Sequence, residues 1–270
     1  MTAPDALETG FGTASPPGDN LLNDFVQENA ASFAGFGTAR GDRVGRIDGV
    51  VTLVDAASPL PFSNRAVLER PLGDVQAVLD HVRPFYDGAS DVPFLLDSAW
   101  PTPDLGPVGL ALMGHPPLMV RAAEVPLPDL PPKLDIVRVS DEQHAYDFEH
   151  TLIYGYPAPA LQPMHAVTIM TPGALAAPGW HHFVGYVDGE PVATGSAYVG
   201  ARLVRLDNIA TLESARGRGY GRAMTAAAIA ADPTKPATLI ASDLGRPVYE
   251  RLGFEAVLRC TYWVGSRGAG

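Results

Sequence analysis

The sequence has a single cysteine, Cys260, among 270 residues, and this lack of thiols excludes an internal disulfide. Nothing then demands an oxidising compartment, so we expect a cytoplasmic protein. Cys260 alternates with apolar residues in a predicted strand, which is typical of an inert core thiol rather than a nucleophile. The sequence also lacks cysteine and carboxylate clusters with zinc-ligand spacing, and we therefore predict no metal site.

Basic residues are scarce as well, since 19 lysines and arginines face 30 acidic residues and leave a net charge of -11. Such a surface is repelled by phosphate backbones and anionic lipids, so we expect neither nucleic acid nor a membrane as partner. No stretch approaches the roughly 18 apolar residues of a membrane span, and no basic cluster followed by an apolar run occurs in residues 1–20. With 46% hydrophobic residues the chain is predicted to be globular.

Prolines cluster between Glu124 and Lys133, where they forbid helix and favour an extended spacer. A chain of this length suits two domains, and we place the boundary in this segment. The predicted organisation is a flexible arm over 1–19, an N-terminal domain over 20–123, a linker over 124–133 and a C-terminal domain over 134–270.

The C-terminal half alternates strand and helix patterns, which predicts a mixed α/β sheet with helices on both faces. Ser140 is expected to open the first helix as part of a capping box. The predicted strands are 134–139, 182–187, 192–199, 203–212, 237–241 and 255–264, and the predicted later helices are 219–231 and 247–252.

The N-terminal half is predicted to be a faint copy of this arrangement. Asn20 is expected to cap a helix, strands are predicted at 44–54 and 66–69, and a helix at 74–86. The stretch 104–108 repeats the Asp-Leu-Gly and Pro-Val pattern of 243–248. This half has no Arg-x-x-Gly-x-Gly run, and Leu110 stands where we expect the counterpart of Tyr249, so we predict a degenerate, non-catalytic unit.

The most informative stretch runs from Asn208 to Arg222 and predicts a strand, a glycine-spaced turn and a helix start. Glycines permit a turn whose N–H groups point inward, and the positive end of the helix dipole attracts phosphate oxygens. Arginines 202, 205, 216, 218 and 222 gather here in an otherwise acidic chain, which bound phosphate would explain. The stretch therefore predicts an anion site.

The run Arg216-Gly217-Arg218-Gly219-Tyr220-Gly221 resembles the Gln/Arg-x-x-Gly-x-Gly/Ala signature of the GNAT acetyltransferases. The run 242–254 resembles the second conserved block of that family, and the likeness covers about residues 182–264. It implies a GNAT-like mixed sheet flanked by helices. With the internal echo, it predicts two tandem GNAT-like domains.

The resemblance implies an acetyl-CoA-dependent N-acetyltransferase that moves the acetyl group directly to a primary amine of a small molecule or protein. Tyr249 would protonate the leaving thiolate. The strand residues Ile209, Ala210 and Thr211 would hold the pantetheine arm and the thioester oxygen. The pyrophosphate would be held by Arg216, Gly217, Arg218, Gly219, Tyr220, Gly221 and Arg222.

Several alternatives stay open on the sequence alone. The proton of the attacking amine can pass to Asp207, to Glu213 or to water. A non-catalytic acyl-CoA sensor would keep the same motifs, and a dinucleotide-binding oxidoreductase shares Gly217-x-Gly219 but has Arg222 at its third glycine position. The acceptor amine is not indicated, and the chain is expected to be a monomer or a homodimer.

Overall fold

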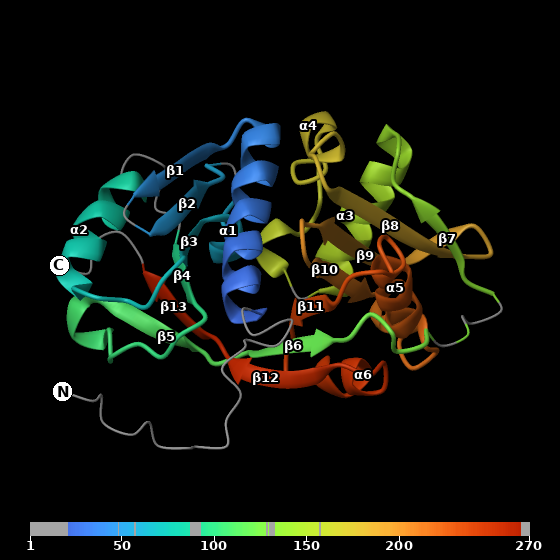
Figure 1. Cartoon of the computed structure of the whole chain (residues 1–270). Helices are drawn as coiled ribbons and strands as arrows, with labels where there is room; N and C mark the ends of the chain where they lie inside the picture. The colour runs from blue at the N-terminus through green and yellow to red at the C-terminus, as the bar shows by residue number, and fades with distance from the viewer. Residues whose placement is uncertain are drawn as a thin grey trace, which may run out of the picture.

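The computed structural model describes residues 21–47, 49–56, 58–86, 93–127, 129, 133–156 and 158–265. Two twisted sheets lie side by side, with helix α1 standing between them (Figure 1). The arm over 1–19 and the predicted cap Asn20 lie outside the described residues. The helices are α1 (Leu21–Arg40), α2 (Val75–Tyr86), α3 (Glu142–Gly155), α4 (Pro172–Leu175), α5 (Tyr220–Ile229) and α6 (Arg246–Glu250), with 3-10 turns η1 (Pro61–Ser63), η2 (Gly106–Val108), η3 (Pro159–Leu161) and η4 (Glu213–Ala215).

The first sheet has six strands in the order β1-β2-β3-β4-β13-β5. The second has seven in the order β12-β6-β11-β10-β9-β8-β7. Within the described residues, β3 pairs with β4 and β10 pairs with β11 in parallel, whereas all other neighbours are antiparallel. The strands are β1 (Arg43–Ile47), β2 (Val50–Val54), β3 (Arg65–Leu68), β4 (Phe94–Ser98), β5 (Leu110–Gly114), β6 (Pro117–Arg121), β7 (Asp135–Arg138), β8 (Trp180–Val187), β9 (Glu190–Val199), β10 (Val204–Thr211), β11 (Ala237–Ile240), β12 (Glu255–Arg259) and β13 (Thr261–Gly265).

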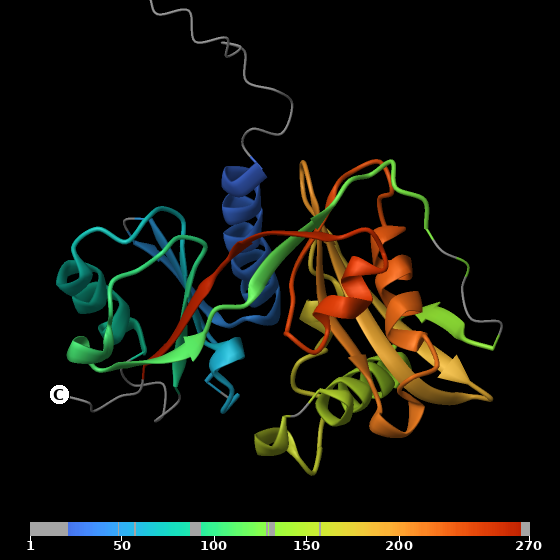
Figure 2. The same cartoon turned by 90° about the horizontal axis from the view of Figure 1, so that it is seen from below.

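The two sheets exchange one strand each. Strand β6, from the N-terminal half, pairs with β11 and β12, while the C-terminal strand β13 pairs with β4 and β5. Figure 2 shows these two segments passing side by side from one sheet to the other. The backbone N–H of Cys260 donates to the carbonyl of Pro116 at 2.9 Å where they cross. Each sheet therefore needs a strand from the other half of the chain.

The strand predicted over 255–264 is thus wrong as a single element. Cys260 separates β12 from β13, and the two strands belong to different sheets. The strand predicted over 44–54 is likewise a hairpin, because Gly49 takes a left-handed φ of 84° that turns the chain back. The boundary at 124–133 stays a prediction.

The two halves repeat the same topology. In each, a helix is followed by an antiparallel pair, a third strand, a helix, a parallel fourth strand, a short helical turn, an edge strand and a crossing strand, and the C-terminal half adds β7 before its first helix. Strand β3, helix α2 and strand β4 correspond in this order to β10, α5 and β11. The predicted duplication is confirmed at the level of the fold, although Leu110 begins β5 instead of lying in a helix opposite Tyr249.

Helix α3 begins one residue later than the predicted capping box. Asp141 is the N-cap, and its Oδ1 accepts the N–H of His144 at 2.8 Å. Ser140 therefore precedes the cap. The strands and helices predicted around residues 182–252 are confirmed with shifts of one to two residues at most ends.

Helix α1 covers β1 to β3 and connects the halves (Figure 1). Its Glu28 carboxylate accepts the backbone N–H groups of Arg202 and Leu203, and its Ser32 carbonyl accepts the indole N–H of Trp180. These contacts fix an N-terminal helix against the C-terminal sheet. Among the described helices, none combines the length and the apolar character needed to cross a bilayer.

Candidate active site

The turn before α5 has the backbone that the glycine spacing predicts. Gly217 and Gly219 both take left-handed φ angles, 78° and 85°, which side chains rarely adopt. The backbone N–H groups in the first turn of α5 have no acceptor within the helix. Within the described residues, the N–H groups of residues 217–222 also have no other backbone hydrogen-bond acceptor. The turn therefore presents free donors at the positive end of a ten-residue helix.

The five clustered arginines serve different parts of the molecule, so one phosphate does not account for all of them. The predicted role of Arg216, Arg218 and Arg222 at the diphosphate stays a prediction. Arg202 lies 3.5 Å from Asp24 of α1, and Arg205 is buried against Asp207. Arg216 donates from Nη2 to the carbonyl of Gly155 at 2.9 Å and ties the end of α3 to the turn. Arg218 is exposed and Arg222 is half-buried, so both remain beside the turn.

Strand β10 separates from β11 just before the turn. The two strands pair at Val204 and Arg205, and within the described residues the rest of β10 has no partner on that side. On its other side β10 pairs with β9, and the N–H of Leu212 donates to Val192. Because strand N–H groups alternate between the two sides, the backbone of Ile209 and Thr211 faces the open edge.

Ala210 lies between them and faces β9. It is buried and pairs with Thr194. Its N–H therefore points away from the open edge, whereas the N–H groups of Ile209 and Thr211 point toward it. The carbonyl of Thr211 on the same edge accepts Arg216 Nε at 3.3 Å.

A bulge at Asn208 sets this alternation. The register between β9 and β10 shifts between Asp207 and Ala210, and Asn208 takes a left-handed φ of 54°. Thr194 Oγ1 donates to the Asn208 carbonyl at 2.8 Å. Asn208 Nδ2 donates to Ser196 Oγ at 3.3 Å, and Ser196 Oγ lies 2.8 Å from Nδ1 of the buried His182. Burial lowers the pKa of His182 to about 4, so this chain of hydrogen bonds ends on a neutral imidazole.

Tyr249 lies on α6 with its ring against Phe254, their centroids 6.0 Å apart. Burial, with a smaller contribution from the Asp207 carboxylate, raises its pKa to about 12. The phenol therefore stays protonated at neutral pH and keeps a proton to donate.

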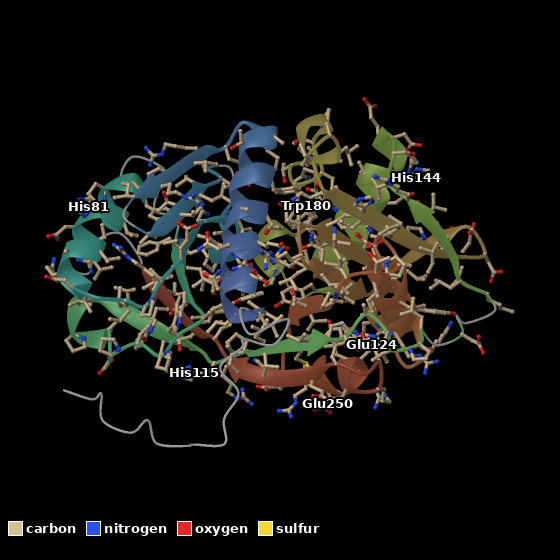
Figure 3. All side chains as sticks on the ribbon, in the orientation of Figure 1. His81, His115, Glu124, His144, Trp180 and Glu250 are labelled. Carbon is tan, nitrogen blue, oxygen red and sulfur yellow. The ribbon has the colours of Figure 1, made fainter. Side chains whose placement is uncertain are left out.

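A cavity of about 720 Å³ lies between the bulge and Tyr249, and residues 210–222 are outside its lining. Asp207, Asn208 and Ile209 of the bulge line it together with Tyr249. The N-terminal half supplies further walls from α1, β3 and the β5–β6 connection. In Figure 3, Trp180 lies beside α1 in the middle of the molecule and His115 lies near the crossing strands; both line this cavity. The remaining lining includes Phe33, Phe36, Arg40, Phe62, Arg65, Met113, Tyr156, Arg205, Asp243, Arg259 and Tyr262.

Asp207 is the inner carboxylate of this cavity. Its Oδ2 accepts Arg205 Nη2 at 2.7 Å, and its Oδ1 accepts the Asn208 N–H at 2.9 Å. Burial by itself would raise the pKa of Asp207, but Arg205, Arg65 and the Asn208 N–H together hold it below its ordinary value. Asp207 is therefore ionised and a weak base, while about a third of its side chain stays exposed.

The two arginines beside Asp207 are held by a ring from α1. The Cζ atoms of Arg65 and Arg205 lie 4.2 and 4.4 Å from the Phe33 ring centroid. Arg65 also donates to the buried Asp97 at 3.2 Å. Arg205 is itself the ion-pair partner of Asp207, but its side chain is buried, whereas a third of the Asp207 side chain is exposed. A ligand in the cavity therefore meets the carboxylate side of this pair.

Sequence reasoning missed most of the cavity wall that lies opposite the C-terminal motifs. Arg65, Phe33 and Tyr262 come from the N-terminal half or from β13, and no motif connects them with the glycine turn. The Asp207-Asn208 pair gives a weak sequence indication of the bulge, because Asn tolerates a left-handed φ. Glu213, the other carboxylate considered as a base, is exposed in η4 and lies outside the cavity lining.

The corresponding turn of the N-terminal half differs in one decisive way. Asp74 precedes α2, and its Oδ1 accepts the N–H of Ala77 at 3.1 Å. A carboxylate therefore lies where α5 offers free N–H groups, and it would repel a diphosphate. Among the described residues, no cluster of three or more His, Cys, Asp or Glu side chains is arranged to hold a metal ion.

The fold and the site together define a tandem protein of GNAT fold. Residues 178–256 match the family model described as acetyltransferase (GNAT) domain. This match falls on the part of the C-terminal half that contains the glycine turn and Tyr249, and the resemblance found in the motifs is confirmed. A search of curated proteins found no match.

Solved structures of the same fold cover nearly the whole chain. A GCN5-related N-acetyltransferase from Kribbella flavida has a TM-score of 0.64 at 20% identity over 90% of this chain and 96% of its own. One from Sphaerobacter thermophilus has 0.54 at 12% over 90% and 93%. A tandem GNAT protein from the clavulanic acid biosynthesis pathway has 0.53 at 13% over 92% and 96%. At these identities the likeness establishes the fold alone.

Proposed function

We propose that the protein is an acetyl-CoA-dependent N-acetyltransferase that transfers the acetyl group directly to a primary amine. The observation that carries this proposal is the continuity of one path. The unpaired edge of β10 connects the free N–H groups of residues 217–222 with Ile209, which lines the cavity together with Tyr249. A diphosphate at the turn would place the thioester end of the same molecule beside the bulge.

The chemistry follows from the groups along that path. The amine nitrogen attacks the thioester carbonyl, a C–N bond forms and the C–S bond breaks. The N–H of Ile209 or Thr211 on the open edge would stabilise the developing oxyanion by about 3 kcal/mol. The phenol of Tyr249 supplies the proton that the leaving thiolate takes.

The proton released by the amine goes to water in this proposal. Asp207 is within the cavity, but its lowered pKa makes it a poor proton acceptor at neutral pH. Its charge instead suits an ammonium group awaiting deprotonation. The amine would therefore bind as a cation beside the bulge and react after losing its proton.

Two experiments test the proposal. Calorimetric titration should detect tight binding of acetyl-CoA and none of NAD, because the largely antiparallel sheet around β10 does not form a dinucleotide fold. Thiol release should then rise above background with at least one amine in a panel. If the coenzyme binds and no amine releases thiol, the protein is an acyl-CoA sensor.

A further inference from the structure

The walls of the cavity are mainly aromatic and aliphatic. Three rings that line the same cavity as the bulge come from different elements. They are Phe36 of α1, Tyr156 after α3 and Trp180 of β8. Phe36 and Trp180 pack together with centroids 5.1 Å apart, and Tyr156 is 45% exposed. A ligand in this space therefore meets ring surfaces on several sides.

The charges that line the cavity are mostly occupied. The side chains of Arg40, Arg65 and Arg205 are each less than 10% exposed and each lies against a carboxylate. Asp42 is 11% exposed and lies 3.4 Å from Arg40. Asp207 differs, because a third of its side chain is exposed and a carboxylate oxygen accepts more than one hydrogen bond.

The third lining carboxylate, Asp243, is too far out to make a second inner cation site. It is 85% exposed and lies 3.9 Å from Arg259. A polycation needs several accessible carboxylates at matched spacings, and the described lining supplies one inside and one at the exposed rim. The cavity therefore suits a single positive charge joined to an apolar body.

Asp207 also lies within electrostatic reach of two of the phenols that line the cavity. Its charge raises the pKa of Tyr249 and of Tyr156, in each case after burial as the larger cause. An ammonium on Asp207 would thus share the cavity with the proposed proton donor and with the exposed ring of Tyr156.

We propose that the acceptor is a monoamine whose single primary amino group is carried on an aromatic ring system by a short chain, with Asp207 binding the ammonium and Tyr156 the ring. This proposal rests on the proposed transferase function. The bound ammonium loses one proton to water before it attacks, the nitrogen then bonds to the acetyl carbon and loses a second proton, and the C–S bond breaks. Tyr249 protonates the thiolate and regains its proton from solvent, so free coenzyme thiol and one net proton are released.

The test compares amines that share a primary amino group. Wild-type enzyme with saturating acetyl-CoA is assayed for thiol release with 2-phenylethylamine, n-butylamine, spermidine, kanamycin and a short peptide with a free N-terminus. We expect kcat/KM for phenylethylamine to exceed that for butylamine by about 10-fold or more, because a buried ring contributes that much binding. A higher kcat/KM with spermidine, kanamycin or the peptide overturns the proposal.

Matched variants test the role of the ring. Tyr156→Ala should raise KM for phenylethylamine by about 10-fold and leave KM for butylamine and the Kd of acetyl-CoA unchanged. Tyr146→Ala removes a comparably exposed tyrosine of α3 outside the cavity and should change none of these values. Equal KM values in both variants overturn the assignment of Tyr156.

The two levels of proposal fail differently. If acetyl-CoA binds but no amine of any class releases thiol, both the transferase function and the acceptor class are wrong. If amines are acetylated and the linear or polycationic ones react best, the acceptor class alone is wrong.

Discussion

Replacing Tyr249 by phenylalanine tests the proposed proton donor with little structural disturbance. The ring would keep its packing against Phe254, 6.0 Å away between centroids. The phenol makes no hydrogen bond to another described residue, so its loss leaves no partner unsatisfied. We expect the free energy of unfolding to change by less than about 0.5 kcal/mol.

The rate should change far more than the stability. General acids contribute about 100-fold or more, and loss of this one should lower kcat about 100-fold, equivalent to about 2.7 kcal/mol in the activation barrier. The Kd of acetyl-CoA should stay within about twofold. Because the pKa of Tyr249 is raised to about 12, its ionisation should add no falling limb to the wild-type kcat profile at neutral or mildly alkaline pH.

Steady-state thiol release and calorimetry measure these two quantities. Tyr198→Phe is the matched control, because it removes a phenol outside the cavity lining and should leave kcat unchanged. If Tyr249→Phe retains the wild-type kcat across the pH range, the phenol does not donate the proton, and the leaving thiolate must be protonated by another group.

Three further outcomes are expected. Arg216→Ala should lower the free energy of unfolding, measured by urea titration, by about 2 kcal/mol, because the hydrogen bonds of its guanidinium to α3 and β10 are lost. Arg218 is exposed, so Arg218→Ala should leave stability unchanged and weaken coenzyme binding in a salt-dependent way. The pKa of His182 falls from 6.5 to about 4 on folding, so the unfolded chain binds more protons between these pH values and stability falls as the pH drops through this window. His182→Asn should remove about 3 kcal/mol of this acid dependence. An equal dependence of the free energy of unfolding on pH in both proteins would contradict this. Residues 134–270 expressed alone should aggregate, because β6 fills the sheet between β11 and β12 and is missing from this fragment. Co-expression with residues 1–123 should make the fragment soluble. A stable, monomeric fragment 134–270 would contradict this.

The sequence predicts local structure well where a single element carries its own signal. The glycines at 217 and 219 require left-handed φ, and both have it. The Asp188-Gly189 pair predicts the hairpin between β8 and β9, and the structure confirms it. These features depend on a few neighbouring residues, so pattern alone suffices.

Long-range features are beyond such reasoning. Nothing in the alternation of residues 255–264 distinguishes one long strand from two strands in different sheets, because both bury alternate residues. The same holds for Arg65 and Arg205, which lie 140 positions apart and meet on Phe33 only after α1 docks between the sheets. The acceptor side of the cavity is therefore a product of tertiary structure.

The acidic composition also has a more local meaning than it first suggests. The excess of negative charge favours a cationic acceptor in general terms. Inside the cavity, however, Asp42 pairs with Arg40 and Asp207 pairs with Arg205, and of these two carboxylates Asp207 keeps the more exposed side chain. The proposed cationic acceptor therefore depends on this one local carboxylate and not on the net charge of the chain.

The most direct test of the account is the affinity of coenzyme A for Gly217→Asp compared with Gly189→Asp. Both glycines have left-handed φ, 78° and 86°, and both have open space beside Cα, so each substitution should cost about 1 kcal/mol of stability. A carboxylate at Gly217 would face the diphosphate, and calorimetry should show binding weakened by about 100-fold or more, with Gly189→Asp like wild type. Equal affinities in the two variants would show that the turn from Arg216 to Arg222 does not hold the coenzyme.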